Sequence, residues 1–273
     1  MSPYAGAPWD GVAGSRVTFF GHATVGVETA GTLLLTDPLL RGHVAFLRWH
    51  APLPPTASCA DVQAVLISHL HHDHCDPRSL LLLGRQRTLL VPWGTAGFFR
   101  RRGFQDVVAM RPGQVHAAGA VEVTATEAAH DGRRRPFGPS GPALGYLLSA
   151  PGLRVYYAGD TDLFPGMSEL GKGLDIALLP VAGWGRTLGP GHLDPVRAAE
   201  ATRLLRPSVA VPVHWGALHP VWDRTPSART ARAPALAFAA EVRRRRLPTE
   251  VVVLPPGGEL SWPRGGPVPR SSV

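Results

Sequence analysis

The chain has few cysteines and no long apolar run. Cys59 and Cys75 are the two cysteines among 273 residues, so we expect no structural disulfide, and a reducing compartment suffices for this protein. No apolar run approaches the roughly 20 residues that a helix needs to cross a bilayer. The N-terminus also lacks the basic segment and following apolar segment of a secretory signal. These absences predict a cytoplasmic protein without a transmembrane segment.

Lysine is almost missing, although the net charge is positive. Lys172 is the single lysine, yet 28 basic residues against 20 acidic ones give a formal net charge of +8. Such a charge can indicate a nucleic-acid or membrane partner, but its origin in arginine, beside abundant Ala, Gly and Pro, is typical of a compositional bias. We interpret the arginine runs at 100–102, 133–135 and 243–246 as solvated helix ends and loops. The run at 133–135 is the best placed to contact a substrate anion because it follows His130.

Short apolar runs predict a fold rich in strands. Hydrophobic residues make up 44% of the chain and charged residues 18%, as in folded globular proteins. Hairpin-like runs come first, and later runs alternate with helical segments. This order predicts an α/β fold in which two sheets pack face to face with helices outside. The expected strands cover residues 16–20, 25–29, 32–36, 63–67, 88–91, 106–109, 121–126, 144–149, 153–158, 175–180, 208–213 and 250–254.

Two helices have clear start signals. Asp76 before Pro77, and Asp194 before Pro195, each combine an N-cap carboxylate with proline at the first helical position. The Ala-rich stretch 234–246 is a third expected helix. We expect a single hydrolase domain at 15–262 between flexible tails at 1–14 and 263–273, since both tails are rich in Gly and Pro.

The segment 68–76 is the most informative part of the sequence. It reads SHLHHDHCD, with four histidines and two aspartates directly after an apolar strand. Three further residues, His130, Asp160 and His214, also follow apolar strands, and ligands at strand ends can converge at one edge of a sheet. Isolated histidines elsewhere, at 43, 50, 116 and 219, are interpreted as structural or surface residues. The predicted metal ligands are His69, His71, Asp73, His74, His130, Asp160 and His214.

This ligand set predicts two metal ions. Imidazole and carboxylate suit zinc, manganese or iron, with zinc as the first choice, and seven ligands are too many for one tetrahedral ion. Two ions would produce a bridging hydroxide near neutral pH and would polarise the substrate oxygen, so the expected chemistry is hydrolysis. We hypothesise that Asp73 both binds metal and orients the hydroxide, and that Asp160 bridges the ions.

The run HLHHDH resembles the HxHxDH signature of the metallo-β-lactamase superfamily, and His130, Asp160 and His214 follow in that family's order. The resemblance extends from Val17 to His214 and implies a four-layer αβ/βα sandwich with the metals at the sheet edge. It also implies the allocation of ligands: His69, His71 and His130 to the first metal, Asp73, His74 and His214 to the second, and Asp160 to both.

The words GHATV, TDPLL, YAGDTDLF, GHLDP and PVHWG resemble one branch of this superfamily. That branch holds N-acylphosphatidylethanolamine-hydrolysing phospholipase D and the ascorbate-6-phosphate lactonase-like proteins. The resemblance implies that His22 lies near the metals and that His192 approaches the substrate and serves the leaving group. The sequence departs from the phospholipase-like pattern at Asp162, where glycine is usual, and in the Arg- and Pro-rich loop after His130.

Several functions share these features. The leading hypothesis is hydrolysis of a phosphodiester or related small ester, with a small and anionic substrate. Lactone hydrolysis uses the same chemistry. An RNA or DNA nuclease is disfavoured because no clamp domain is inserted between His130 and His214, so nucleic acid is not the expected partner. A non-catalytic metal-binding protein is disfavoured because all seven ligands are present. A di-iron oxygen-reducing role is disfavoured because such sites carry Glu where His71 stands.

Overall fold

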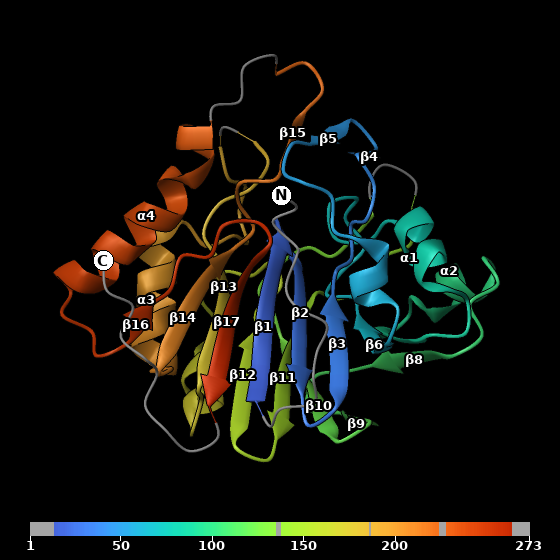
Figure 1. The fold of residues 1–273 in the computed structure, drawn as a ribbon, viewed down its shortest axis with the longest axis horizontal. Coiled ribbons are helices and arrows are strands. Elements are labelled where there is room, and N and C mark those ends of the chain that lie inside the picture. The colour runs from blue at the N-terminus through green and yellow to red at the C-terminus, as the bar shows by residue number, and fades with distance from the viewer. Residues whose placement is uncertain (1–13, 135–137, 186, 224–227, 264–273) are drawn as a thin grey trace.

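The short apolar strands assemble into two seven-stranded sheets that pack face to face, with helices on the outer faces (Figure 1). The computed structural model describes residues 14–134, 138–185, 187–223 and 228–263. The first sheet has the order β17-β1-β2-β3-β6-β7-β8 and the second has the order β16-β14-β13-β12-β11-β10-β9. The strands of the first sheet are β1 (Gly14–Gly21), β2 (Thr24–Thr29), β3 (Thr32–Thr36), β6 (Val62–Leu66), β7 (Thr88–Pro92), β8 (Val107–Met110) and β17 (Gly258–Pro263). Those of the second are β9 (Val115–Ala118), β10 (Val121–Glu127), β11 (Leu144–Ala150), β12 (Leu153–Tyr157), β13 (Ile176–Pro180), β14 (Val209–Val213) and β16 (Glu250–Val251).

Each sheet is antiparallel in one part and parallel in the other. Strands β17, β1, β2 and β3 pair antiparallel, whereas β3, β6, β7 and β8 pair parallel. The second sheet is antiparallel from β9 to β12 and parallel from β12 through β13 and β14 to β16. This arrangement confirms the predicted α/β sandwich.

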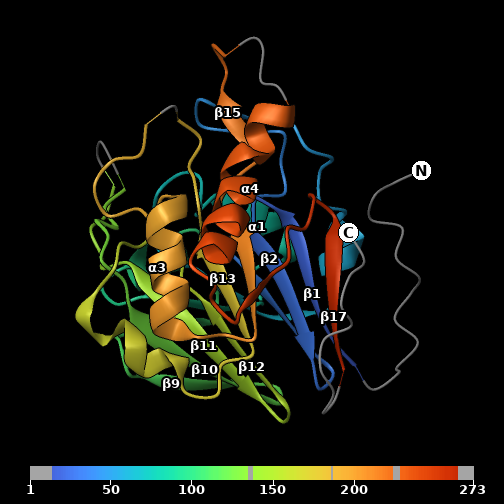
Figure 2. The ribbon, with the colours of Figure 1, turned by 90° about the vertical axis from the view of Figure 1, so that its left-hand side faces the viewer.

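The helices cover the two outer faces. They are α1 (Pro77–Leu83), α2 (Ala96–Arg100), α3 (Pro195–Leu205) and α4 (Ala228–Arg244), with 3-10 turns η1 (Thr56–Cys59) and η2 (Pro165–Gly171). Figure 2 shows α3 and α4 side by side outside the second sheet, where they contact β13 and β14. None of the helices in the described part of the chain combines the length and apolar character needed to cross a bilayer.

Alternation along the strands builds separate apolar layers. Between the sheets, Val17, Phe19 and Val27 of the first sheet pack in one cluster with Tyr146 and Val155 of the second, all fully buried. On the opposite side of the first sheet, a further cluster joins its strands to α1 and α2. The sandwich therefore has the four layers expected from the sequence.

Both expected helix starts are confirmed. Asp76 accepts hydrogen bonds from the backbone N–H groups of Arg78 and Ser79, and Asp194 accepts one from Arg197. Helix α4 differs from its expected bounds because it begins at Ala228 and contains Pro234 in its interior. A proline inside a helix removes one backbone hydrogen bond, and in α4 the buried Phe238 and neighbouring apolar residues offset that loss by packing into the core.

The ends of the sandwich extend one residue beyond the predicted limits. Gly14 pairs with Pro263 across β1 and β17, because a strand ladder needs backbone groups and no apolar side chain. The rest of the expected tails lies outside the described residues. The sequence also missed β9, β17 and a three-stranded sheet formed by β4 (His43–Val44), β5 (Leu47–Trp49) and β15 (Leu218–Pro220), the last three strands being too short to show alternation. The strand expected at 250–254 is shorter in the structure, where β16 covers Glu250–Val251.

The Tyr146 hydroxyl joins the two sheets. It donates to the carbonyl oxygens of Ile67, at 2.8 Å, and Leu90, at 3.2 Å, which belong to the opposite sheet. We predict that Tyr146→Phe lowers the free energy of unfolding by about 1–2 kcal/mol, because it leaves buried acceptors without this donor. Urea denaturation in the presence of a chelator measures this effect without a contribution from bound metal. An unchanged unfolding midpoint would contradict the role assigned to the hydroxyl.

Candidate metal centre

The predicted ligands meet at one edge of the sandwich, on loops that follow its strands. The segment 68–76 follows β6, and two ligands follow β12 and β14 of the other sheet. Parallel strands present their carboxyl ends at the same edge, which brings residues distant in sequence together. The predicted site residues occupy these places: His22 between β1 and β2, His69 to His74 after β6, His130 after β10, Asp160 after β12, His192 before α3 and His214 after β14.

One group of four donors contains three histidines from two loops and a carboxylate. His69, His71, His130 and Asp160 offer ligand atoms within 4.8 Å of one another. His71 Nδ1 lies 2.9 Å from His69 Nε2 and 3.2 Å from His130 Nε2. A tetrahedral zinc ion with ordinary Zn–N bonds separates two nitrogen ligands by about 3.3 Å. The two distances from His71 Nδ1 are close to this value, so these nitrogens could serve one such ion.

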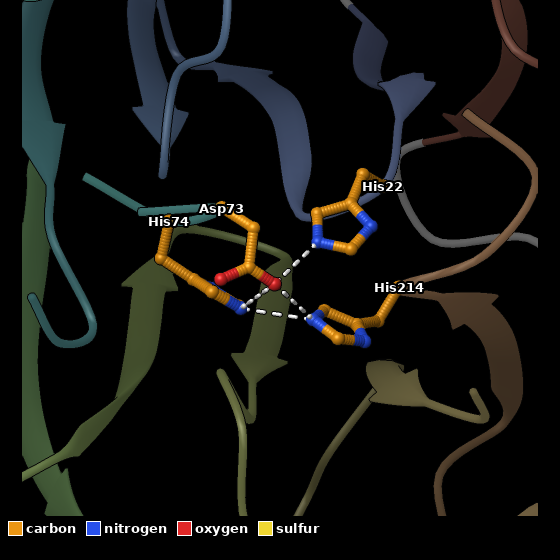
Figure 3. A group of neighbouring side chains, drawn as sticks. All are labelled: His22, Asp73, His74 and His214. Atoms are coloured by element: carbon orange, nitrogen blue, oxygen red, sulfur yellow. Dashed lines mark hydrogen bonds and ion pairs between the residues drawn. The ribbon is translucent and has the colours of Figure 1, made fainter. Parts of the chain in front are cut away.

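The second group contains three histidines and Asp73 (Figure 3). His74 Nε2 and His214 Nε2 lie 2.9 Å apart. Asp73 Oδ2 is 3.1 Å from His22 Nε2 and 3.4 Å from His214 Nε2. The sequence hypothesis placed His22 near the metals, and the structure puts it among the donors themselves.

Asp160 lies between the two groups. Its Oδ2 atom is 3.1 Å from His74 Nε2 and 3.9 Å from His69 Nε2, and its Oδ1 atom is 3.2 Å from His214 Nε2. The side chain is 2% exposed, and Oδ1 makes no hydrogen bond. A buried carboxylate oxygen without a hydrogen bond is costly unless another positive group satisfies it. This position suits a carboxylate that binds two cations.

Asp37 orients the ligands from outside the centre, and sequence reasoning missed its role. Ser68 Oγ donates to Asp37 Oδ2 at 2.5 Å, so Ser68 Oγ must accept the hydrogen bond from His69 Nδ1 at 3.0 Å. His74 Nδ1 and the Tyr157 hydroxyl also donate to Asp37 Oδ2, at 2.7 and 2.6 Å. Its position in the sequence could have indicated this role, because Asp37 directly follows an apolar strand in the word TDPLL.

Backbone carbonyls orient two further rings. His130 Nδ1 donates to the Gly191 carbonyl at 2.8 Å, and His214 Nδ1 donates to the Ala182 carbonyl at 2.6 Å. With Nδ1 protonated, each ring directs its Nε2 lone pair into the centre, as metal-binding histidines usually do.

These tautomers test whether the residues fit metal ions. If the Nε2 atoms of His74 and His214 both carry lone pairs, they face each other at 2.9 Å and repel unless a cation or a proton lies between them. The same is true of the neighbouring nitrogens in the first group. The donor set and the unsatisfied oxygen of Asp160 therefore fit two divalent cations.

Burial and neighbouring charges set the protonation of the centre. Burial lowers the pKa of His22 and of His71 to about 4, so both rings are neutral at pH 7. Burial also acts to lower the pKa of His74, but Asp160 and Asp73 raise it well above its ordinary value. Burial acts to raise the pKa values of Asp73 and Asp160, yet the neighbouring histidines hold both well below their usual range. Two ionised carboxylates thus attract positive charge into the centre.

Two residues of the centre and the neighbouring Asp37 adopt left-handed backbone conformations. The φ angles are 52° at His22, 35° at Asp37 and 64° at His214. Such conformations cost of order 1 kcal/mol or more for residues other than glycine and are found at functional sites. The backbone N–H of His214 donates to the carbonyl of His22 at 2.7 Å, which ties the two strained turns to each other.

His192 lies at the edge of the centre and is accessible to solvent. Its Nδ1 atom donates to the carbonyls of Gly189 and Pro190, and its Nε2 atom lies 3.4 Å from Asp160 Oδ2. Partial burial acts to lower the pKa of His192, but Asp160 raises it above its ordinary value.

Arg134 binds residues of the protein itself, whereas the sequence indicated the run 133–135 as the arginine run best placed to contact a substrate anion. Its guanidinium donates to the carbonyls of Leu70 and Cys75, at 2.8 Å each, and to His72 Nδ1 at 2.9 Å. It therefore braces the ligand-bearing loop. Arg133 is exposed, and residue 135 lies outside the described residues.

Asp162 also has a structural partner. Its carboxylate accepts a hydrogen bond from Arg197 Nε at 2.6 Å, and its backbone N–H donates to the Ala129 carbonyl. This departure from the phospholipase-like pattern thus links the loops of Asp160 and His130 to α3.

The cysteines do not take part in the centre. Both are free and buried, which confirms that no disulfide joins them. Burial raises the pKa of the Cys75 thiol to about 12, and neither donor group contains a cysteine.

A pocket of about 520 Å³ opens over the two groups. Its size lies within the range of small-molecule sites. Five of the predicted site residues line it: His71, Asp73, Asp160, His192 and His214.

Known proteins share this sequence pattern and fold. A family model described as beta-lactamase superfamily domain matches residues 32–215, a range that includes every predicted metal ligand. A UPF0173 metal-dependent hydrolase of Opitutus terrae is 32% identical over 245 residues, 87% of this chain and 96% of the relative. One from Methanopyrus kandleri is 31% identical over 250 residues, 89% of this chain and 97% of the relative.

A solved structure has the same fold. Igni18, a metallo hydrolase from Ignicoccus hospitalis, gives a TM-score of 0.69 at 24% identity and covers 92% of this chain and 99% of its own. The resemblance to the metallo-β-lactamase superfamily is thereby confirmed. The chain belongs to the β-lactamase superfamily domain family and, within it, to the UPF0173 metal-dependent hydrolases.

Proposed function

We propose that this protein hydrolyses a phosphodiester or a related small ester with the help of two divalent cations, zinc in the first place and manganese or iron as alternatives. The observation that carries the proposal is the pair of adjoining four-donor groups with Asp160 between them. The pocket above them has the size of a small-molecule site, which favours a small substrate over nucleic acid.

The two groups would hold one cation each. His69, His71 and His130 serve the first, and Asp73, His74 and His214 serve the second. His22 is an additional donor to the second cation, and Asp160 serves both. When bound, the cations lower the pKa of water and polarise the oxygen of the scissile bond.

Asp73 orients the attacking water in this proposal. Its contacts with His22, His74 and His214 all go through Oδ2, which leaves Oδ1 to accept a hydrogen bond from the attacking water. Since its pKa is held low by the histidines, Asp73 is ionised and able to accept that hydrogen bond at neutral pH.

His192 serves the leaving group. Its Nδ1 proton is held by two carbonyls, and its Nε2 atom lines the pocket next to Asp160. Because Asp160 favours the protonated ring, Nε2 can hold a proton and deliver it to the departing oxygen.

Metal binding and turnover are expected to depend on the same residues. The wild-type protein is expected to bind about two equivalents of metal and to hydrolyse bis(p-nitrophenyl) phosphate. His69→Ala removes a ligand and should lower turnover by at least about 100-fold, more than the loss expected from an outer contact. His116→Ala, on strand β9 away from the centre, is the control and should change neither metal content nor turnover.

Plasma mass spectrometry and turnover on the same sample check this prediction. Less than one equivalent of metal under metal-replete conditions, with no turnover, would refute the hydrolase and favour a binding protein. A preference for a simple lactone over the diester would assign the protein to the lactonases.

The role of Asp73 has its own test. Asp73→Asn should lower kcat by about 10²–10⁴-fold, as loss of a general base does, while most of the metal is retained because the imidazoles remain. Metal content and kcat are measured on the same preparation. Unchanged turnover would mean that another group orients the nucleophile.

Asp37 is expected to act as a positioning residue. Asp37→Asn replaces an oxygen acceptor by an amide that cannot accept from His74, Ser68 and Tyr157 together, and it should weaken metal binding about 10- to 100-fold. Competition with a chromophoric chelator measures the affinity. The control is Asp106→Asn, since Asp106 accepts a hydrogen bond from Thr88 on the surface. Equal affinities in wild type and Asp37→Asn would show that Asp37 does not tune the centre.

A further inference from the structure

An aromatic surface lines the pocket of the candidate metal centre. It consists of Phe46, Trp184 and Trp222, which line the same pocket as Asp73 and His214; we call these three residues the aromatic wall. Leu47, Leu188 and Pro220 extend it. The pocket therefore combines the candidate polar groups with an apolar surface.

The small sheet keeps the wall in place. Phe46 lies in the turn between β4 and β5, Trp184 follows β13, and Trp222 follows β15. The ring of Phe46 stacks on Trp222 at 5.4 Å and meets Trp184 edge-on at 5.1 Å between centroids. The backbone N–H of Val221 donates to the Phe46 carbonyl at 2.9 Å. The three rings thus form one preorganised surface built from three separate segments.

The wall exposes apolar area that a monomeric protein usually buries. Phe46 is 39% exposed and Trp222 is 66% exposed. Exposed apolar groups that gather beside a polar site mark a place where a ligand or partner binds and covers them. Because this surface forms the side of a pocket that ends on the candidate ligands, the substrate of that centre is the occupant that fits.

The arginines near the centre lie outside this pocket. None of the described residues that line this pocket is Arg or Lys. The nearby arginines line a separate pocket of about 630 Å³, which shares His72 with the first: they are Arg41, Arg78, Arg102 and Arg134. The described walls of the metal pocket thus offer no arginine or lysine side chain to a charged substituent.

We propose that the substrate carries an uncharged apolar substituent, an aryl ring or a short alkyl chain, which packs on the aromatic wall while its ester group meets the candidate ligands. This inference rests on the proposed function, since it takes the pocket over the centre as the substrate site. It assigns recognition of the substituent to Phe46, Trp184 and Trp222, and recognition of the reacting group to the metal ligands.

Calorimetric titration of the zinc-loaded full chain tests the wall without turnover. The probes are phenylphosphonate and methylphosphonate, which share one head group and differ in the substituent. We expect phenylphosphonate to bind about tenfold more tightly, as burial of one face of a phenyl ring allows. Trp222→Ala and Phe46→Ala should bring the ratio of the two dissociation constants close to one and leave the affinity for methylphosphonate unchanged.

Two further variants separate the wall from general effects. Trp93→Ala is the control, because Trp93 is 50% exposed but lies under Arg111, away from the pocket, so its loss should keep the preference. Trp222→Phe should keep most of it, since an aromatic face remains. Equal binding of the two probes to wild type, absence of phenylphosphonate binding, or a preference that survives both alanine changes in the wall would overturn the proposal.

The wall and the proposed function can fail separately. A phenyl preference that depends on the wall, in a protein that hydrolyses no ester, would support the wall and refute the hydrolase. Diester turnover by a protein that binds both probes equally would support the hydrolase and refute the wall.

Discussion

The candidate centre depends on a proton at Nδ1 of each buried imidazole whose Nε2 atom points into it. Asp37 is the main group that holds these protons in place, since it accepts from His74, Ser68 and Tyr157 while fully buried. Ser68 Oγ accepts a hydrogen bond from His69 Nδ1, so Asp37 also orients the ring of His69 through Ser68. Tyr157 belongs to β12 of the second sheet, and Asp37 follows β3 of the first. A single carboxylate thus joins both sheets to the loop of candidate ligands, and the hydrogen bonds that it accepts direct the imidazole lone pairs toward the centre.

This arrangement explains where strain is placed. His22 and His214 take left-handed conformations, and only a rigid frame can hold residues there against their preference. The frame is the pair of sheets, whose strands end immediately before these turns. Gly159 shows the same tight geometry, since a Cβ atom at this position would lie 2.7 Å from Ser68 Cβ and 2.9 Å from the Leu144 carbonyl. The ligand-bearing loop can approach β12 only because this position has no side chain.

The sequence predicted most strands of the two large sheets, though not β9 and β17, and the candidate ligands for the same physical reason. Alternating strands and the dense histidine segment are local patterns, and ligands after apolar strands share an edge once the fold is known. What the sequence missed depends on contacts between distant segments. Asp37 was visible only as part of a flanking word, because its partners are 31 to 120 residues away. The short strands β4, β5 and β15 carry no periodicity, so neither the small sheet nor the aromatic wall could be predicted.

Attraction of the reacting group and recognition of its substituent can come from different parts of the site. Asp73 and Asp160 are ionised within the sandwich, and two bound dications would exceed their charge, so the centre itself can attract an anionic reacting group without an arginine. The described walls of the pocket are then free to be apolar, and Phe46, Trp184 and Trp222 supply that character from the small sheet and neighbouring loops. The candidate ligands lie on loops that follow strands of the two large sheets, whereas Phe46 and Trp222 lie beside strands of the small sheet, whose apolar residues form a separate cluster. Changes in the wall can therefore alter which substituent is accepted while the hydrogen bonds that orient the imidazoles stay intact.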